Sequence, residues 1–371
     1  TSKATQAQNE FHAKLSLQME KLGLQQSATD RCLFVSSGDS PNKVYACVWM
    51  DQILLSGPCS DDVDALIARL GEIYDITVDK EVKKFVKQQI TRHRSQRLLK
   101  ISLHDYVETL AAKHLPSDMT TYESIPMAPG VFLTPPTHRE PPCKRPYRSL
   151  VRSLLYVGNI CRPDICFAAN QLAQHMNRYT EEHWKVAVNV LSYLKSTSAY
   201  GVWLGGEQGD NHELRMDYDV IWRKKPYEKL SVTGRLCLLG SSPLTWTAKR
   251  IASVANNNTI AHFISMTQAH EDLMEMSRLV QDFHLPVSTP VMCYGHSQFI
   301  TEISQSTPPR VENSEIDEKI AKLSTMIHSK QVTMKFVEAH ELSSLGLIDT
   351  LAGQQFIQNR SSMRVSADTF M

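Results

Sequence analysis

Positive side chains are concentrated between residues 81 and 100. Seven Lys and Arg residues stand there against a single acidic residue, Glu81, and they are Lys83, Lys84, Lys87, Arg92, Arg94, Arg97 and Lys100. Such a run can contact the phosphates of a nucleic acid, or it can be an ordinary solvated face. The whole chain has 40 basic and 39 acidic side chains and a net charge of +1, so total charge does not indicate a nucleic-acid partner. A nucleic-acid function would therefore depend on local patches.

The eight cysteines could bind a metal ion or form disulfides. No two of them have the two-residue spacing of a zinc knuckle. Cys161 and Cys166 lie close in the chain and could suggest a metal site, but two small buried residues near a helix start have the same pattern. Cysteines scattered in this way are typical of intracellular proteins, in which thiols stay reduced. We therefore expect an intracellular protein, nuclear or cytoplasmic, in which the cysteines bind no metal.

Composition places the chain among globular proteins. Its 371 residues allow two or three domains, and 42% hydrophobic with 21% charged residues argues against disordered and fibrous classes. No stretch approaches 18 uninterrupted apolar residues, and the first ten residues contain neither a basic nor an apolar segment. We therefore expect neither a membrane span nor a secretory signal, and no membrane partner.

The first half of the chain predicts two helices, three strands and a connector. Apolar residues at steps of three and four predict a helix over 5–23 that ends at Gly23. Apolar runs at 32–35 and 44–50 predict strands, and the second returns through a two-residue turn at Asp51 and Gln52 into a strand at 53–55. The acid-rich segment 61–70 predicts a helix. Residues 116–146 contain eight of the 17 prolines and predict an extended connector.

The second half predicts a helical region followed by a mixed domain. Three helices are expected within 147–195, and the last of them has Thr180 as N-cap with Glu181 and Glu182 in its first turn. Strands are expected at 214–220, 230–239 and 243–247, then a helix at 259–283, a strand at 291–294, a helix at 315–328, a strand at 332–337 and a last helix from Leu342. Consecutive strands followed by alternating helices and strands predict an α/β (α+β) fold with a sheet of mixed direction.

Several ordered motifs resemble the Pol polyproteins of copia-type LTR retrotransposons. The segment that joins reverse transcriptase to RNase H in that family is similar to residues 147–156, 162–165, 183–184 and 191–197. The palm segment ahead of the polymerase's paired-aspartate hairpin is similar to residues 21–24 and 30–34. Strands of the family's RNase H domain are similar to residues 230–234, 244–246 and 330–337. The resemblance covers nearly the whole chain.

The resemblance implies a fold and a domain order. It implies a partial reverse-transcriptase palm and a helical connection, followed by an RNase H-like mixed five-stranded sheet with flanking helices. We expect a palm and thumb remainder over 1–115, the Pro-rich connector over 116–146, the helical connection over 147–200, the RNase H-like domain over 201–360 and a tail over 361–371. In the family, the fingers and the palm strand with the first catalytic aspartate precede the segment that matches Thr1.

The polymerase motif departs from the family pattern. Where the family has Tyr-X-Asp-Asp, this chain has Trp49, Met50, Asp51 and Gln52. The family's polymerases use two divalent cations held by adjacent carboxylates. Gln52 offers a neutral amide, which is a weaker ligand for a hard cation. We therefore expect no complete polymerase site.

The RNase H motifs depart in the same way. The family uses four carboxylates and two metal ions, and the matching positions here are Asp217, Ile260 in Ile260-Ala261-His262, His296 and Leu347. A shift of two residues would bring Asp349 to the last position. One carboxylate of four cannot hold two Mg²⁺ ions, so we expect no metal cofactor and no catalytic residue. Alternatively, Asp217, His262 and His296 could form a zinc or manganese centre.

The expected function is that of a pseudoenzyme, a domesticated transposable-element protein with lost reverse transcriptase and ribonuclease H activity. It would serve as an interaction scaffold for RNA, DNA, an RNA-DNA hybrid, or host or element-encoded proteins. The cations of 81–100, joined by Arg139, Lys144, Arg145, Arg148 and Arg152, would contact phosphates. Two alternatives stay open. The chain could be a subunit or fragment of an active RNA-directed DNA polymerase and ribonuclease H completed by another chain, or a protein scaffold that touches no nucleic acid.

Overall fold

The computed structural model describes residues 3–38, 42–131, 133–137, 143–206, 213–222, 231–251, 257–285, 287–298, 301–302 and 314–369. They form two compact units, one of Thr1–Ile90 with Met274–Val287 and one of Thr91–Leu273 with Ser288–Met371. The domain limits expected from the resemblance do not coincide with these units and stay a prediction. None of the described helices is long and apolar enough to cross a membrane.

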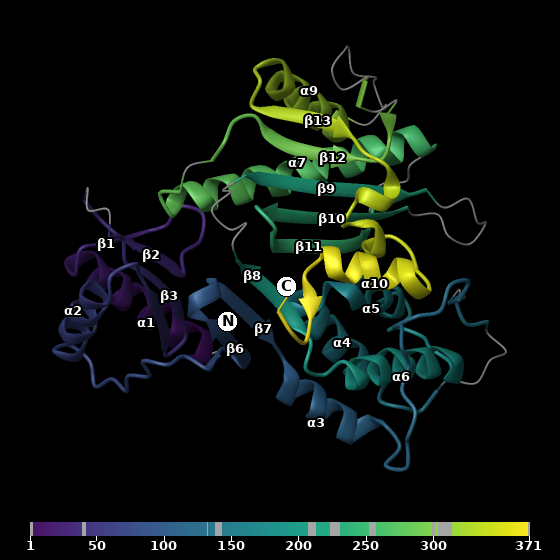
Figure 1. The fold of residues 1–371 in the computed structure, drawn as a ribbon, viewed down its shortest axis with the longest axis horizontal. Coiled ribbons are helices and arrows are strands. Elements are labelled where there is room, and N and C mark those ends of the chain that lie inside the picture. Colours follow the sequence, from purple (N-terminus) through teal and green to yellow (C-terminus); the bar gives the residue numbers. More distant parts are fainter. Residues whose placement is uncertain are drawn as a thin grey trace. The chain divides into compact units, whose positions relative to one another are not determined.

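The first unit is built on a four-stranded antiparallel sheet of order β1-β2-β3-β4 (Figure 1). Its strands are β1 (Leu24–Gln26), β2 (Leu33–Ser36), β3 (Tyr45–Trp49) and β4 (Gln52–Ser56). Helices α1 (Lys3–Lys21) and α2 (Ser60–Gly71) pack on one face, where Met19, Phe34 and Ala46 are fully buried. Both helices and all but β1 were predicted, because apolar periodicity is a local signal.

The turn between β3 and β4 lies one residue earlier than predicted. Trp49 pairs with Gln52, so the two loop residues are Met50 and Asp51. Met50 has a φ of +54°, the left-handed conformation that tight hairpin loops require. Gln52 therefore belongs to the strand and not to the turn.

The end of the long helix α7 (Asn258–Asp282) also belongs to the first unit. The Asp282 carboxylate accepts hydrogen bonds from the Ser27 hydroxyl and from the Thr29 amide. The Tyr45 hydroxyl donates to the Phe283 carbonyl at 2.9 Å, and the two aromatic rings lie 5.1 Å apart. These contacts attach the C-terminal end of α7 to the loop between β1 and β2 and to β3.

The second unit contains a mixed five-stranded sheet of order β11-β10-β9-β12-β13 (Figure 1). Strands β9 (Leu214–Ile221), β10 (Val232–Leu239) and β11 (Ser242–Arg250) are antiparallel, whereas β12 (Val291–Gly295) and β13 (Val332–Phe336) run parallel to β9. This is the RNase H-like mixed sheet that was expected, and the α/β fold class is confirmed. Helix α7 covers one face, where Arg235 is bonded to Asp272 and Gln268.

The opposite face of this sheet is covered by the C-terminal segment. Here the prediction of a helix from Leu342 was wrong. The chain forms two short 3-10 helices, η4 (Ala339–Glu341) and η5 (Leu345–Leu347), and α10 begins only at Gly353 (Gly353–Ser362). The side chain of Asn359 explains the irregular segment, because its amide donates to the carbonyls of Leu342 and Ser343 and its oxygen accepts from the Gly346 amide.

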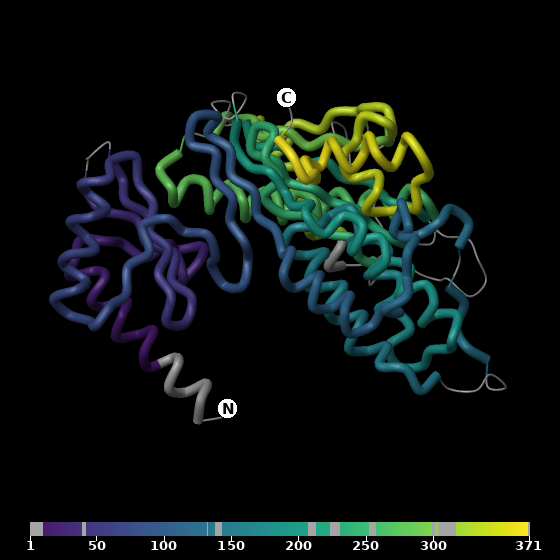
Figure 2. Tube along the Cα trace, turned by 60° about the horizontal axis from the view of Figure 1, so that its bottom comes forward, coloured from purple at the N-terminus to yellow at the C-terminus, as the bar shows by residue number. Residues whose placement is uncertain are grey.

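A helical layer forms the largest core of the second unit. It consists of α3 (His104–His114), α4 (Tyr147–Cys161), η2 (Pro163–Ile165), α5 (Cys166–Ala173) and α6 (Glu181–Ser196), which pack against one another (Figure 2). Thr180 caps α6 as predicted, and the partner in its capping box is His183. The preceding Pro-rich stretch has neither helix nor strand over its described residues, as predicted.

A third sheet, of order β14-β8-β7-β6-β5, was not predicted. Its strands are β5 (Lys84–Phe85), β6 (Gln88–His93), β7 (Leu98–Ser102), β8 (Gly201–Gly205), β14 (Val365–Ser366). The basic residues hid the strand pattern, because β6 is exposed over its second half and shows no alternation of apolar and polar residues. The basic run is therefore a pair of hairpins.

Candidate functional site

The hairpin that corresponds to the polymerase motif has no pair of carboxylates. Asp51 is exposed in the β3–β4 loop. The side-chain oxygen Oε1 of Gln52 accepts a hydrogen bond from the Val86 backbone amide at 3.1 Å, and this bond holds the β5–β6 turn. Trp49 and Met50 are 50% and 58% exposed. Gln52 thus has a structural contact at the position where the family has its second aspartate.

Asp217, on β9, is buried in a salt bridge. Its Oδ1 accepts from Arg215 Nε at 2.9 Å and its Oδ2 from Arg215 Nη2 at 2.8 Å. The Ser343 amide donates to the same Oδ2 at 3.1 Å. Both carboxylate oxygens therefore have protein donors, and this side chain has no exposed surface.

Two other ionisable side chains are influenced by His296, which follows β12. Gly295 pairs with Tyr218 in the parallel ladder, so His296 and Asp219 follow at the same end of β12 and β9. Burial raises the pKa of Asp219 to about 6, although a bond from the Val220 amide and the charge of His296 act in the opposite direction. Burial, with a contribution from His296, lowers the pKa of His262 to about 4. Asp219 of β9 and His262 of α7 are thus each close enough to His296 to be affected by its charge.

The structure places the other expected RNase H positions apart from this group. Ile260 lies in the first turn of α7, half-buried. Leu347 is fully buried in η5 and packs over Gly234 of β10. Asp349 is exposed and accepts a hydrogen bond from the Thr350 amide. His262, and not Ile260, is therefore the residue of the helix motif that faces the sheet end.

This donor set does not fit two Mg²⁺ ions. Magnesium prefers oxygen ligands, whereas His262 and His296 present nitrogen and the oxygens of Asp217 bind Arg215 and Ser343. Over the residues that the structure describes, no three His, Cys, Asp or Glu side chains lie together as a metal ion would require, and this also applies to the zinc or manganese alternative.

The basic residues are mainly exposed, and most of them lie within strands or helices. Lys83, Lys84 and Lys87 flank the β5–β6 turn of the first unit, and Arg92, Arg94 and Arg97 surround η1 (Arg94–Gln96) between β6 and β7 of the second. Arg148 and Arg152 are exposed on α4, and Arg148 donates to the Met176 carbonyl. Lys100 differs, since its ammonium donates to the carbonyls of Ala199 and Ala367. Arg139 lies outside the described residues.

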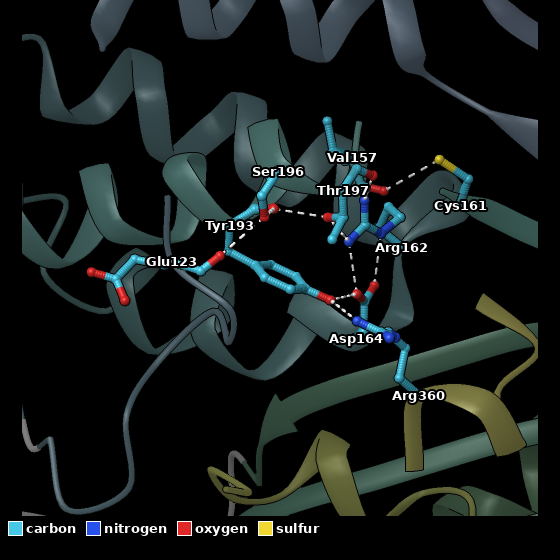
Figure 3. A network of polar contacts seen from close by, with 9 residues as sticks. All are labelled: Glu123, Val157, Cys161, Arg162, Asp164, Tyr193, Ser196, Thr197 and Arg360. Atoms are coloured by element: carbon cyan, nitrogen blue, oxygen red, sulfur yellow. Dashed lines mark hydrogen bonds and ion pairs between the residues drawn. The ribbon is translucent and has the colours of Figure 1, made fainter. Parts of the chain in front are cut away.

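A buried polar network, which sequence reasoning missed, joins α4, η2, α6 and α10 (Figure 3). Arg162 donates to both oxygens of Asp164, at 2.9 and 2.8 Å, and both side chains are at most 1% exposed. Tyr193 donates to Asp164 at 2.6 Å, and Arg360 donates to the Tyr193 hydroxyl at 3.2 Å. Burial opposes ionisation of Asp164, but Arg162 outweighs it and holds the pKa of that carboxyl below its usual value. The Arg-Pro-Asp motif therefore has a structural role.

Buried histidines make the stability of the protein depend on pH. Burial lowers the pKa of His175, His262 and His270 to about 4, helped by positive neighbours. Below about pH 6.5 the three histidines take up protons in the unfolded chain but not in the folded chain. The free energy of unfolding therefore decreases as the pH is lowered from 6.5 to 4. Each histidine lowers the free energy of unfolding by up to about 1.4 kcal/mol per pH unit in this range. Asp219 offsets the effect of one histidine, because its raised pKa makes the folded chain bind a proton before the unfolded chain does.

Urea denaturation at pH 7.0 and 5.0 measures this effect. We expect a clearly lower midpoint at pH 5.0, and a smaller difference in the His270→Gln variant. His328, which is exposed, provides the matched control, because His328→Gln should leave the difference unchanged. Equal midpoints at the two pH values would contradict the prediction.

Comparison with known proteins identifies relatives in transposons. No family model matches the chain. It is 26% identical over 294 residues to the retrovirus-related Pol polyprotein from transposon RE2 of Arabidopsis thaliana, covering 78% of this chain and 19% of the relative. It is 23% identical over 345 residues to the Pol polyprotein from transposon TNT 1-94 of Nicotiana tabacum, covering 91% and 25%. The chain thus spans about a fifth to a quarter of these relatives.

Among solved structures, the chain is similar to ribonuclease H domains. LC11-RNase H1, isolated from compost, has 18% sequence identity and a TM-score of 0.26, and the match covers 34% of this chain and 85% of that one. The same enzyme in complex with an RNA/DNA hybrid gives 19% identity, a TM-score of 0.25, and coverage of 34% and 84%.

Proposed function

We propose that the chain is non-catalytic and serves as a scaffold that binds nucleic acid. The homologues of this chain are retrovirus-related Pol polyproteins of copia-type transposons. Its RNase H-like sheet would act through shape and surface charge, without metal chemistry. No metal cofactor is part of this proposal.

The donor set around the end of β9 is the observation that supports the non-catalytic part, because Asp217 is bonded within the protein and histidines accompany Asp219. An aspartate that is to bind Mg²⁺ needs lone pairs directed at the ion. Here Arg215 takes one hydrogen bond position on each oxygen, and the Ser343 amide takes another. Histidines at positions 262 and 296 add nitrogen donors in place of carboxylates. Metal binding at Asp217 would therefore have to break its salt bridge, and Asp219 would offer a single carboxylate beside nitrogen donors.

The β6–β7 hairpin supports the nucleic-acid part. Arg92, Arg94 and Arg97 are exposed around its loop, and residues 82–102 contain no acidic side chain. Phosphates attract such a loop, and binding that depends on phosphate contacts releases counterions. Lys100 is left out of this surface because its ammonium is bonded within the protein.

Salt dependence of nucleic-acid binding tests the proposal. We expect the affinity for a short RNA-DNA hybrid to fall as salt rises, and the triple variant Arg92→Gln, Arg94→Gln, Arg97→Gln to reduce the slope of log K against log salt by roughly 1 for each arginine. Lys185, exposed on α6, gives the control, since Lys185→Gln should leave the slope unchanged. An affinity that does not change with salt concentration would contradict binding through phosphate contacts.

One observation favours a second function. Because the chain matches only 19% of the RE2 polyprotein, it could be one part of a working polymerase and ribonuclease H that another chain completes. In that case Mg²⁺-dependent polymerisation or hybrid cleavage would be found in the presence of the partner and not with this chain alone. Activity of the purified chain by itself would overturn the non-catalytic proposal.

A further inference from the structure

A cavity of about 480 Å³ lies in the second unit, beside the first residues of β9 and the C-terminal end of α10. Its polar lining consists of Arg215, Arg364, Ser241, Ser343, Ser362 and Glu213. Guanidinium groups and serine hydroxyls are groups that donate hydrogen bonds to oxyanions, and both kinds line this cavity. None of these residues belongs to the basic hairpins, so the cavity is a separate feature of the molecule.

Arg364 is held at the edge of this cavity by its backbone and its side chain. It lies between α10 and β14 with a φ of +55°, and its carbonyl accepts from the Trp203 amide at 3.0 Å. One guanidinium nitrogen, Nη1, donates to the Ser241 hydroxyl. Burial lowers the pKa of this guanidinium, which means that its charge has lost part of its hydration. An anion in the cavity would replace that hydration.

Arg215 is the second guanidinium group that lines the cavity. Two of its nitrogens bind Asp217, and its guanidinium lies 4.7 Å from the centre of the Tyr294 ring. The Lys335 ammonium lies 5.9 Å from the same ring but does not line the cavity. Glu213 acts against an anion, since it lines the same cavity. Asp217 offsets the charge of Arg215 and Glu213 offsets that of Arg364, so hydrogen-bond donors rather than excess charge would hold an anion here.

We propose that this cavity binds a phosphate group carried by a nucleotide. A tetrahedral phosphate can accept from Arg364 and from the Ser241 hydroxyl at the same time, and guanidinium groups suit its geometry better than ammonium groups. The Ser362 hydroxyl is not counted among these donors, because it donates to the Asn359 carbonyl. The volume exceeds that of a phosphate ion and lies in the usual range of small-molecule sites, which leaves room for an attached nucleoside. The source is either a free nucleotide or the backbone of a nucleic acid. The inference goes beyond the proposed function because it uses none of the hairpin cations.

Titration of the full chain tests the proposal with three probes, which are inorganic phosphate, adenosine monophosphate and a single-stranded oligonucleotide. We expect saturable binding of adenosine monophosphate that is weakened at least about tenfold in Arg364→Gln and by a smaller factor in Ser241→Ala. Glu213→Gln should strengthen binding, because it removes the opposing charge. Ser241→Ala and Glu213→Gln keep the test valid if Arg364→Gln fails to fold.

The outcomes separate this proposal from the nucleic-acid proposal. Adenosine monophosphate that binds more tightly than inorganic phosphate indicates a free nucleotide as the source. Oligonucleotide binding that is lost in Arg364→Gln and kept in the hairpin variant Arg92→Gln, Arg94→Gln, Arg97→Gln indicates the nucleic-acid backbone. Both support the phosphate site. If no probe binds, or if binding is unchanged in Arg364→Gln and Glu213→Gln, the phosphate site is refuted. This conclusion does not depend on whether the β6–β7 hairpin binds nucleic acid.

Discussion

Replacement of Arg162 by Leu should lower the free energy of unfolding by about 3–5 kcal/mol. The pair with Asp164 is almost completely buried, and loss of the guanidinium leaves the Asp164 carboxylate without its two strongest donors. A buried charge without a partner costs far more than the pair contributes as a whole. Urea denaturation of the variant and the parent measures the difference.

A double-mutant cycle tests the reason for this loss. Asp164→Leu should cost a similar amount, because it leaves the buried Arg162 without its carboxylate. The double variant Arg162→Leu, Asp164→Leu should cost clearly less than the sum of the two single variants. The exposed pair of Lys80 and Asp64 is the control, since Lys80→Leu should change stability by less than about 1 kcal/mol. Additive losses would show that the two side chains are not coupled.

Replacement of Gly201 by Ala should destabilise the second unit by about 3 kcal/mol. A Cβ atom at this position would lie 2.3 Å from the Ile101 carbonyl oxygen and 2.9 Å from Ser102 Cβ. The oxygen belongs to the backbone of β7, which pairs with β8 through Ser102 and Gly201, so it cannot rotate away. The variant must separate the two strands locally.

Gly71 provides the matched control for this substitution. It ends α2 and has only the Ile76 side chain near a Cβ, at 3.7 Å, which is an ordinary contact. Gly71→Ala should therefore be neutral or stabilising by up to about 1 kcal/mol, because alanine has less backbone entropy to lose. Thermal unfolding of the two variants compares them, and equal melting temperatures would contradict the close approach of β7 and β8.

The candidate site could be predicted in part from the sequence. His262 and His296 were expected to lie together with an aspartate of β9, and both contribute to the group at the sheet end. The aspartate was expected to be Asp217, whereas in the structure Asp219 is the one affected by the charge of His296. In a strand, residues 217 and 219 lie on the same face, so the alternation of side chains allows either of them. The two aspartates differ in their partners, because Arg215 of the same strand binds the carboxylate of Asp217 and not that of Asp219.

The sequence by itself determined most of the helices, the mixed sheet and the loss of carboxylates, because periodicity, capping and residue type are local properties. Only the tertiary structure decided the pairing of β7 with β8, which joins residues far apart in the chain. It also decided the burial of Arg162 with Asp164 and the meeting of Arg215 with Arg364 at one cavity. The physical reason is that strand register, burial and electrostatic contact depend on which distant segments are brought together, and no local pattern records that choice.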